Sequence, residues 1–158
     1  MKTSWMVVCI SAVVFFLPGV KAAAAPPNLS GEWQLNLAKS SYGKFPTPLS
    51  MTRRIVHNDP KLILSSVQKG AQGEVASTLA FTTDGKESVN KLGGGDSKGT
   101  ARWIGEKLTI ESSREFQGAT LQQKDIWTLS ADGKTLTVDS HVSLPNGEFD
   151  VKQVFDKR

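Results

Sequence analysis

The sequence has little of the chemistry that covalent catalysis or metal binding requires. Its only cysteine is Cys9, and its only histidines are His57 and His141. Metal sites need several ligands close together and nucleophiles need an activating partner, so we expect no metal site, no haem and no covalent enzyme. The glycine run at 93–95 is not followed by Gly-Lys-Ser, which argues against a phosphate-binding loop. We predict no cofactor.

Long apolar runs are also absent, except at the N-terminus. Lys2 precedes an apolar run over 5–17, and three alanines at 22–24 supply small residues for cleavage. This order is typical of a secretory signal peptide, and the run is short for a membrane-spanning helix. We therefore expect residues 1–24 to be a signal peptide. The protein would be secreted or periplasmic, with no stable membrane insertion after cleavage.

Residues 25–158 have the length of a single domain with one hydrophobic core. Because Cys9 lies in the signal peptide, the exported domain has no disulfide, and its sheet and packing must stabilise it. Loss of Lys2 and Lys21 lowers the formal net charge from +4 to +2. This weak charge gives no reason to expect a nucleic-acid partner. We expect a monomer.

What the sequence does contain is a series of short alternating runs separated by turn residues. In the first of them, at 29–37, Trp33, Leu35 and Leu37 alternate with polar residues, which predicts a strand. Further strands are predicted over 50–57, 61–68, 74–83, 86–92, 98–104, 107–115, 120–129, 134–143 and 148–156. The connections are too short for crossover helices, so neighbouring strands should be antiparallel.

An antiparallel meander of this length leaves exposed edges unless it closes on itself. We therefore predict an all-β fold, an up-and-down barrel of about ten strands, with eight strands as the alternative. Gly31 gives the first strand room to bend, and Trp33 is expected to fill the end of the barrel.

The alternation also predicts which polar side chains point inward. Arg53, Arg114, Asp125 and Gln153 fall on strand faces that carry large apolar residues. Inward charge is costly unless it is paired or solvated, and ten strands enclose more room than side chains need. We therefore expect a cavity.

Two interpretations of the inward charges stay open. Arg114 and Asp125 lie on adjacent predicted strands and are able to pair, and Arg53 is able to stack on an aromatic ring. Alternatively, an arginine offers its guanidinium to an anionic head group while aromatic residues line the apolar part. The predicted ligand-binding residues are Arg53, Arg114, Asp125, Trp103, Trp127, Gln153 and Phe155.

Two short motifs resemble the calycins, the superfamily of lipocalins and fatty-acid-binding proteins. The motif at 31–35, Gly-Glu-Trp-Gln-Leu, looks like the opening strand of the fatty-acid-binding proteins, and Gln-Val-Phe-Asp-Lys at 153–157 looks like their closing strand. The resemblance implies an exported, bacterial-type member whose barrel carries a small lipophilic molecule. Where that family places an arginine and a tyrosine to hold the ligand carboxylate, this chain has Gln153 and Phe155. The helix-turn-helix lid of the family has no counterpart at 38–48.

The first functional hypothesis is therefore an exported barrel that binds or carries a small lipophilic or amphipathic ligand, with an anionic ligand as one option. The alternative is a cell-envelope interaction module with a packed interior and no small-molecule ligand. We do not expect an enzyme. The enzyme alternative is a calycin-like isomerase that uses Asp125 with Arg114 as an acid/base and electrophile pair.

Overall fold

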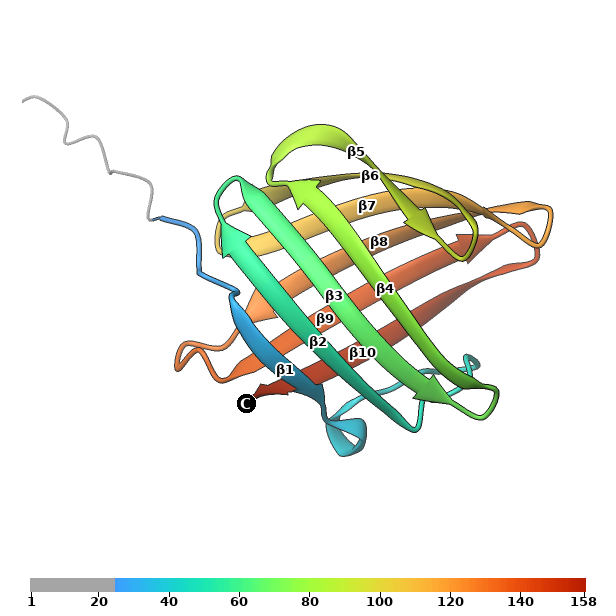
Figure 1. Cartoon of the computed structure of the whole chain (residues 1–158), viewed down its shortest axis with the longest axis horizontal. Coiled ribbons are helices and arrows are strands. Elements are labelled where there is room, and N and C mark those ends of the chain that lie inside the picture. The colour runs from blue at the N-terminus through green and yellow to red at the C-terminus, as the bar shows by residue number, and fades with distance from the viewer. Residues whose placement is uncertain (1–24) are drawn as a thin grey trace, which may run out of the picture.

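The computed structural model describes residues 25–158, and the predicted signal peptide with Cys9 lies outside the described residues. Ten antiparallel strands form a meander wrapped into a barrel (Figure 1). They are β1 (Gly31–Leu35), β2 (Ser50–Asn58), β3 (Lys61–Gly70), β4 (Gly73–Thr82), β5 (Asp84–Leu92), β6 (Gly95–Ile104), β7 (Lys107–Phe116), β8 (Ala119–Leu129), β9 (Thr135–Leu144) and β10 (Gly147–Lys157). The predicted all-β meander of ten strands is confirmed, and the eight-stranded alternative is wrong.

The barrel is nearly closed. The first strand, β1, pairs with β2 on one side and with β10 on the other, which joins the two ends of the chain. The order of hydrogen-bonded strands is β4-β3-β2-β1-β10-β9-β8-β7-β6-β5, so β4 and β5 are its two ends. These two strands follow each other in the chain but share no backbone ladder within residues 25–158.

A side chain bridges this seam between β4 and β5. The Oδ1 atom of Asn90 accepts a hydrogen bond from the backbone N–H of Ala80 at 2.7 Å, and its Nδ2 donates to the carbonyl oxygen of Ala80 at 3.1 Å. The Asn90 amide thus occupies the place that a peptide group has in an antiparallel ladder.

Trp33 closes one end of the barrel, as the sequence predicts. Its ring is fully buried, and its Nε1 donates to the carbonyl oxygen of Leu29 at 3.1 Å. Gly31 has φ +145°, and a Cβ atom there would stand 2.7 Å from Cε of Lys157. The positive φ favours glycine at this position, because a residue with a side chain rarely adopts it. The buried core that contains Trp33 includes Leu29, Ile55, Leu62, Leu108, Leu136 and Phe155.

The segment between β1 and β2 runs along β10 instead of forming a lid of two helices. It contains one turn of 3-10 helix, η1 (Leu37–Lys39), and Ser41 forms an isolated antiparallel bridge with Lys152. The ring of Phe45 meets the ring of Phe149 edge-on at 5.0 Å. We call residues 40–48 the strap. No helix among residues 25–158 is long and apolar enough to cross a membrane.

Candidate functional site: the interior cavity

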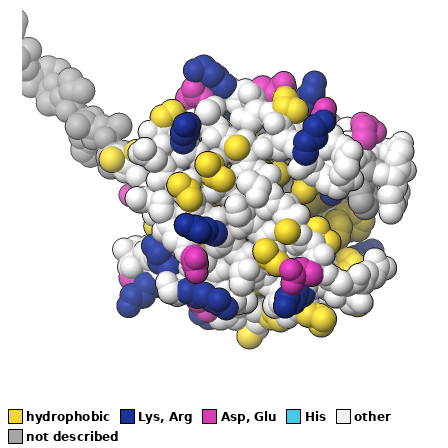
Figure 2. Space-filling view, viewed as in Figure 1, with side chains coloured by type: hydrophobic (Ala, Val, Ile, Leu, Met, Phe, Trp, Pro, Cys, Tyr) yellow, Lys and Arg dark blue, Asp and Glu magenta, His cyan; other side chains and the backbone are white. Residues whose placement is uncertain are grey.

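The barrel encloses a cavity of about 550 Å³. It lies between the core around Trp33 and the turns β3–β4, β5–β6 and β7–β8, and Figure 2 shows the molecule hollowed at that end, with hydrophobic side chains visible inside. It is lined by Met51, Arg53, Leu64, Ser66, Gln68, Val75, Ser77, Leu79, Phe81, Leu92, Ser97, Ile110, Ser112, Arg114, Leu121, Gln123, Asp125 and Trp127. The packed interior of the alternative hypothesis is therefore not what the structure shows.

Arg53 is the central polar residue of this cavity. Its guanidinium carbon lies 5.0 Å from the centre of the Trp127 ring and 4.7 Å from that of Phe155. Its Nε donates to Oγ of Ser66 at 3.1 Å, but its buried Nη1 has no hydrogen-bond partner among residues 25–158. Burial lowers the pKa of Arg53 to about 10, against the charge of Asp125. The side chain still carries its positive charge at neutral pH.

The expected stacking of Arg53 on aromatic rings is thus present, and Nη1 of the guanidinium remains without a hydrogen bond among residues 25–158. An arginine paired with a carboxylate normally uses both ends of its fork. The structure shows no ion pair of Arg53 with a carboxylate among the described residues, and rings cover its faces instead.

Asp125 is half-buried on β8 and faces the same cavity. The Nε2 of Gln123 donates to its two carboxylate oxygens at 2.8 and 3.1 Å. Burial raises the pKa of Asp125, and the hydrogen bonds of Ser140, Gln123 and Trp127 and the charge of Arg53 act in the opposite direction.

The register of β7 and β8 separates Arg114 from Asp125. Arg114 lies opposite Leu121, and Asp125 lies opposite Ile110. Arg114 stands near the β5–β6 turn, where a Cβ on Gly93 would be 3.8 Å from its Nη1. The cation beside Asp125 is Arg53, so the acid/base pair expected from Asp125 with Arg114 is not formed by opposed residues.

The remaining predicted site residues lie around the cavity rather than in its lining. Phe155 is fully buried beneath Arg53, and Trp103 packs at the closed end with its ring centre 5.8 Å from that of His57. The Nε2 of Gln153 donates to the hydroxyl of Tyr42 at 3.1 Å, in a smaller pocket of about 250 Å³ beneath the strap. The structure thus brings Arg53, Asp125, Trp127 and Arg114 into one cavity and leaves these three outside it.

Two features of the site escape the sequence. Trp127 is predicted only as an apolar wall, yet its buried Nε1 offers a donor: it makes no hydrogen bond of ordinary geometry among residues 25–158, but it acts on the Asp125 carboxyl. Tyr42 is not predicted as a site residue, but its charge interaction with Arg53 places it near the guanidinium. Burial raises the pKa of the Tyr42 phenol, so the hydroxyl is protonated at neutral pH. Tyr42 lies in the strap, outside the strands, so the alternation of apolar and polar residues gives no prediction for its side chain.

Two further buried ring nitrogens make no hydrogen bond within residues 25–158: His57 Nε2, which lies 3.6 Å from Oδ1 of Asp59, and Trp103 Nε1. Neither residue lines the cavity. Among residues 25–158, no three histidine, cysteine, aspartate or glutamate side chains come together in a way that would hold a metal ion.

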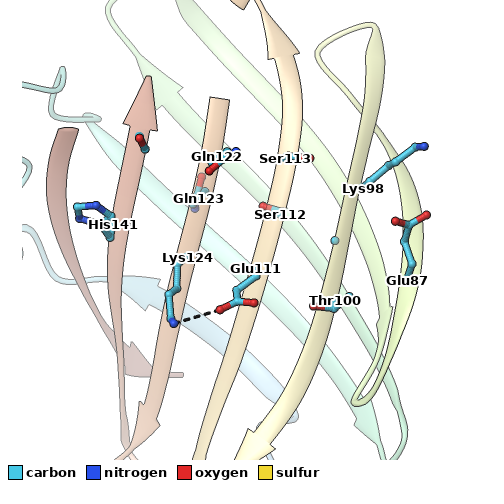
Figure 3. A pocket seen from close by; sticks show the side chains of 12 residues that line it. Glu87, Lys98, Thr100, Glu111, Ser112, Ser113, Gln122, Gln123, Lys124 and His141 are labelled. Carbon is cyan, nitrogen blue, oxygen red and sulfur yellow. Dashed lines mark ion pairs between the residues drawn. The ribbon is translucent and has the colours of Figure 1, made fainter. Parts of the chain in front are cut away.

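A shallow depression of about 480 Å³ also lies on the outer face of β5–β9 (Figure 3). Its central carboxylate is that of Glu111, which pairs with Lys124 at 3.0 Å and with Arg102 at 3.5 Å. Figure 3 shows Lys124 reaching across to Glu111 from the neighbouring strand. Because these charges already satisfy one another, the interior cavity is the better candidate site.

The structure of this chain is similar to several solved structures. A zebrafish ileal bile acid-binding protein, complexed with cholic acid, matches with a TM-score of 0.59 and 22% identity over 82% of this chain and 98% of that one. A fatty acid-binding protein from Drosophila melanogaster brain matches with a TM-score of 0.53 and 14% identity, over 82% and 99% of the two chains. A Schistosoma mansoni fatty acid-binding protein in complex with arachidonic acid matches with a TM-score of 0.51 and 15% identity, over 82% of this chain and 96% of that one.

These likenesses show that the chain has the calycin fold. No family model matches the sequence, and no curated protein matches it. The fold therefore rests on the structure, and function has to be argued from the cavity.

Proposed function

We propose that this chain binds a small lipophilic or amphipathic molecule with an anionic head group inside the barrel. The observation that carries the proposal is a pair of buried donors that line one cavity: Nη1 of Arg53 has no hydrogen-bond partner among residues 25–158, and Nε1 of Trp127 makes no hydrogen bond of ordinary geometry there, although it acts on the Asp125 carboxyl. A buried donor without a partner costs about 1–3 kcal/mol, and more when it is charged. A ligand oxygen placed between the two donors would remove this cost.

The rest of the cavity suits a lipophilic tail. Its volume of about 550 Å³ falls within the range of about 300–1,000 Å³ that is common for small-molecule sites. Its walls include Leu64, Leu79, Phe81, Ile110 and Leu121, which offer apolar surface. A molecule with one charged end and one apolar body fits this division.

The solved structures that share the fold support the same class of ligand. Two of them hold cholic acid and arachidonic acid, which are both lipophilic carboxylic acids. All three are described as binding proteins, so we propose binding without catalysis. At these identities the support is analogy of fold, and the two unpartnered donors are the argument specific to this chain.

Displacement of a fluorescent fatty acid from the delipidated protein tests the proposal. Lauric acid should displace the probe. Arg53→Met should weaken the binding of lauric acid by about 10- to 100-fold, because a charged hydrogen bond is lost. Trp127→Phe keeps the ring and removes only the Nε1 donor, so we expect a loss of about fivefold.

The control variant is Arg54→Met, on the same strand but exposed outside the barrel. It should leave lauric acid binding unchanged, and binding of lauryl alcohol should be insensitive to Arg53→Met. Equal losses in Arg53→Met and Arg54→Met, or no displacement by the wild-type protein, would contradict the proposal. Native mass spectrometry of protein that has not been delipidated would identify a ligand carried through purification.

We also propose that the protein is exported, to a secreted or periplasmic location, and acts as a monomer. The support for export is the apolar run at 5–17 with its small residues at 22–24. N-terminal sequencing of the exported protein should begin at Ala25, and light scattering should give the mass of one chain. A protein that stays in the membrane fraction with its N-terminus intact would refute the export proposal.

A further inference from the structure

Asp125 is the acidic member of the cavity that the proposed ligand would enter. The charged residues that line the cavity are Arg53, Arg114 and Asp125. Asp125 is also close enough to Arg53 for each charge to act on the other. An anion that binds to Arg53 therefore has to share that cation with the Asp125 carboxylate.

Within residues 25–158, the two residues that lie opposite Asp125 on the neighbouring strands carry no charge. On β7 the residue opposite is Ile110, and on β9 it is Ser140. On its own strand, Gln123 donates to both of its oxygens. The other charged or titratable groups on this side of the interior are Arg53 on β2, Arg114 near the mouth and Tyr42 on the strap.

Trp127 fixes where the head group would lie. It follows Asp125 by two residues on β8, so the two side chains point into the barrel from the same face. A head group that accepts from Nε1 of Trp127 and Nη1 of Arg53 therefore lies beside the Asp125 carboxyl. Two like charges around one cation repel each other, and such a pair binds one proton more readily than either carboxylate alone.

We propose that Asp125 takes up one proton from solvent when an anionic head group binds at Arg53 and Trp127. This inference rests on the proposed function, because it concerns the same cavity and the same ligand class. Burial already raises the pKa of Asp125, which brings the uptake closer to neutral pH. Anionic ligands would then bind more tightly in mildly acidic solution and be released as the pH rises.

Calorimetric titration in two buffers of different ionisation enthalpy counts the protons directly. The probes are lauric acid and dodecanesulfonate, added to the delipidated full domain. Because a sulfonate stays charged, any proton taken up with it belongs to the protein. We expect wild-type protein to take up close to one proton with either probe, and the Kd of dodecanesulfonate to rise by up to about tenfold per pH unit where uptake is complete.

Asp125→Asn should abolish the uptake and make the Kd for dodecanesulfonate independent of pH. The matched control is Asp139→Asn, on the neighbouring strand but exposed outside the barrel, which should behave as wild type. Uptake that persists in Asp125→Asn, or that accompanies lauric acid but not dodecanesulfonate, would overturn the inference and assign the proton to another group or to the ligand.

The sulfonate titration of the wild-type protein decides the question even if Asp125→Asn does not fold. Binding of dodecanesulfonate without proton uptake refutes only the role of Asp125. Failure of both probes to bind refutes the proposed function and this inference with it.

Discussion

Asn90 is the residue whose removal most directly tests how the barrel is held together. Its amide makes two hydrogen bonds to the backbone of Ala80, at 2.7 and 3.1 Å, across the only neighbouring strands, β4 and β5, that lack a backbone ladder among residues 25–158. The side chain is buried. Asn90→Ala removes both bonds and leaves the two backbone groups of Ala80 without their partner.

The expected loss follows from these two bonds. Each is worth about 1 kcal/mol net, so Asn90→Ala should lower the free energy of unfolding by about 2 kcal/mol. For a domain of this length that corresponds to a Tm about 6 °C lower. Thermal and urea unfolding measure the stability, and amide hydrogen exchange at Ala80 should become faster than exchange on β2 or β9 because the seam opens locally.

Two further variants sharpen the test. Asn90→Asp keeps the shape but turns a carboxylate oxygen toward the Ala80 carbonyl oxygen, so it should destabilise at least as much as Asn90→Ala. Val89→Thr changes the exposed neighbour on β5 and should alter the stability by less than about 0.5 kcal/mol. An unchanged Tm in Asn90→Ala, with unchanged exchange at Ala80, would refute the idea that this side chain closes the seam.

Three other predictions concern stability. Gly99→Ala should destabilise by about 1–3 kcal/mol in urea unfolding, because the new Cβ would stand 2.8 Å from the Glu111 carbonyl oxygen and 3.2 Å from the Phe81 ring; an unchanged midpoint would contradict this. Trp33→Ala should cost about 3–5 kcal/mol, since it empties the closed end of the barrel; a smaller loss would mean that the site collapses. Asp125 has a raised pKa in the folded state, so its protonated carboxyl stabilises the fold. This stabilisation is fully present below the unfolded-state pKa and is lost as the pH rises through the folded-state pKa. Asp125→Asn should remove this part of the pH dependence of the free energy of unfolding, and an unchanged pH profile would show that Asp125 does not titrate with folding.

The alternation of apolar and polar residues was sufficient to predict the ten strands and their antiparallel order. Such a pattern fixes which face of a strand is buried, because successive side chains point to opposite sides. It says nothing about which pair of strands lacks a ladder. The seam between β4 and β5 depends on the curvature of the whole sheet. Only the structure shows that the Asn90 side chain bonds across this seam to Ala80.

The same limit applies to the candidate site. Alternation placed Arg53, Arg114 and Asp125 inside, and the structure brings all three into one cavity. It left a pairing of Arg114 with Asp125 open, and the register of β7 and β8 places Leu121 opposite Arg114 and Ile110 opposite Asp125. The turn between the two strands sets this register. The unpartnered donors on Arg53 and Trp127 depend on the geometry of neighbouring atoms, which a sequence pattern does not contain.

In this chain the interior arginine Arg53 lies on β2 and not on the closing strand, β10. The resemblance to fatty-acid-binding proteins implies an arginine and a tyrosine on that strand, and this chain has Gln153 and Phe155 instead. In the structure, Phe155 lies beneath the guanidinium of Arg53, and Gln153 donates to the hydroxyl of Tyr42. Since β2 and β10 flank β1 on opposite sides, an arginine on β2 reaches over a ring that β10 provides. The closing strand thus packs a ring against the cation without carrying the cation itself.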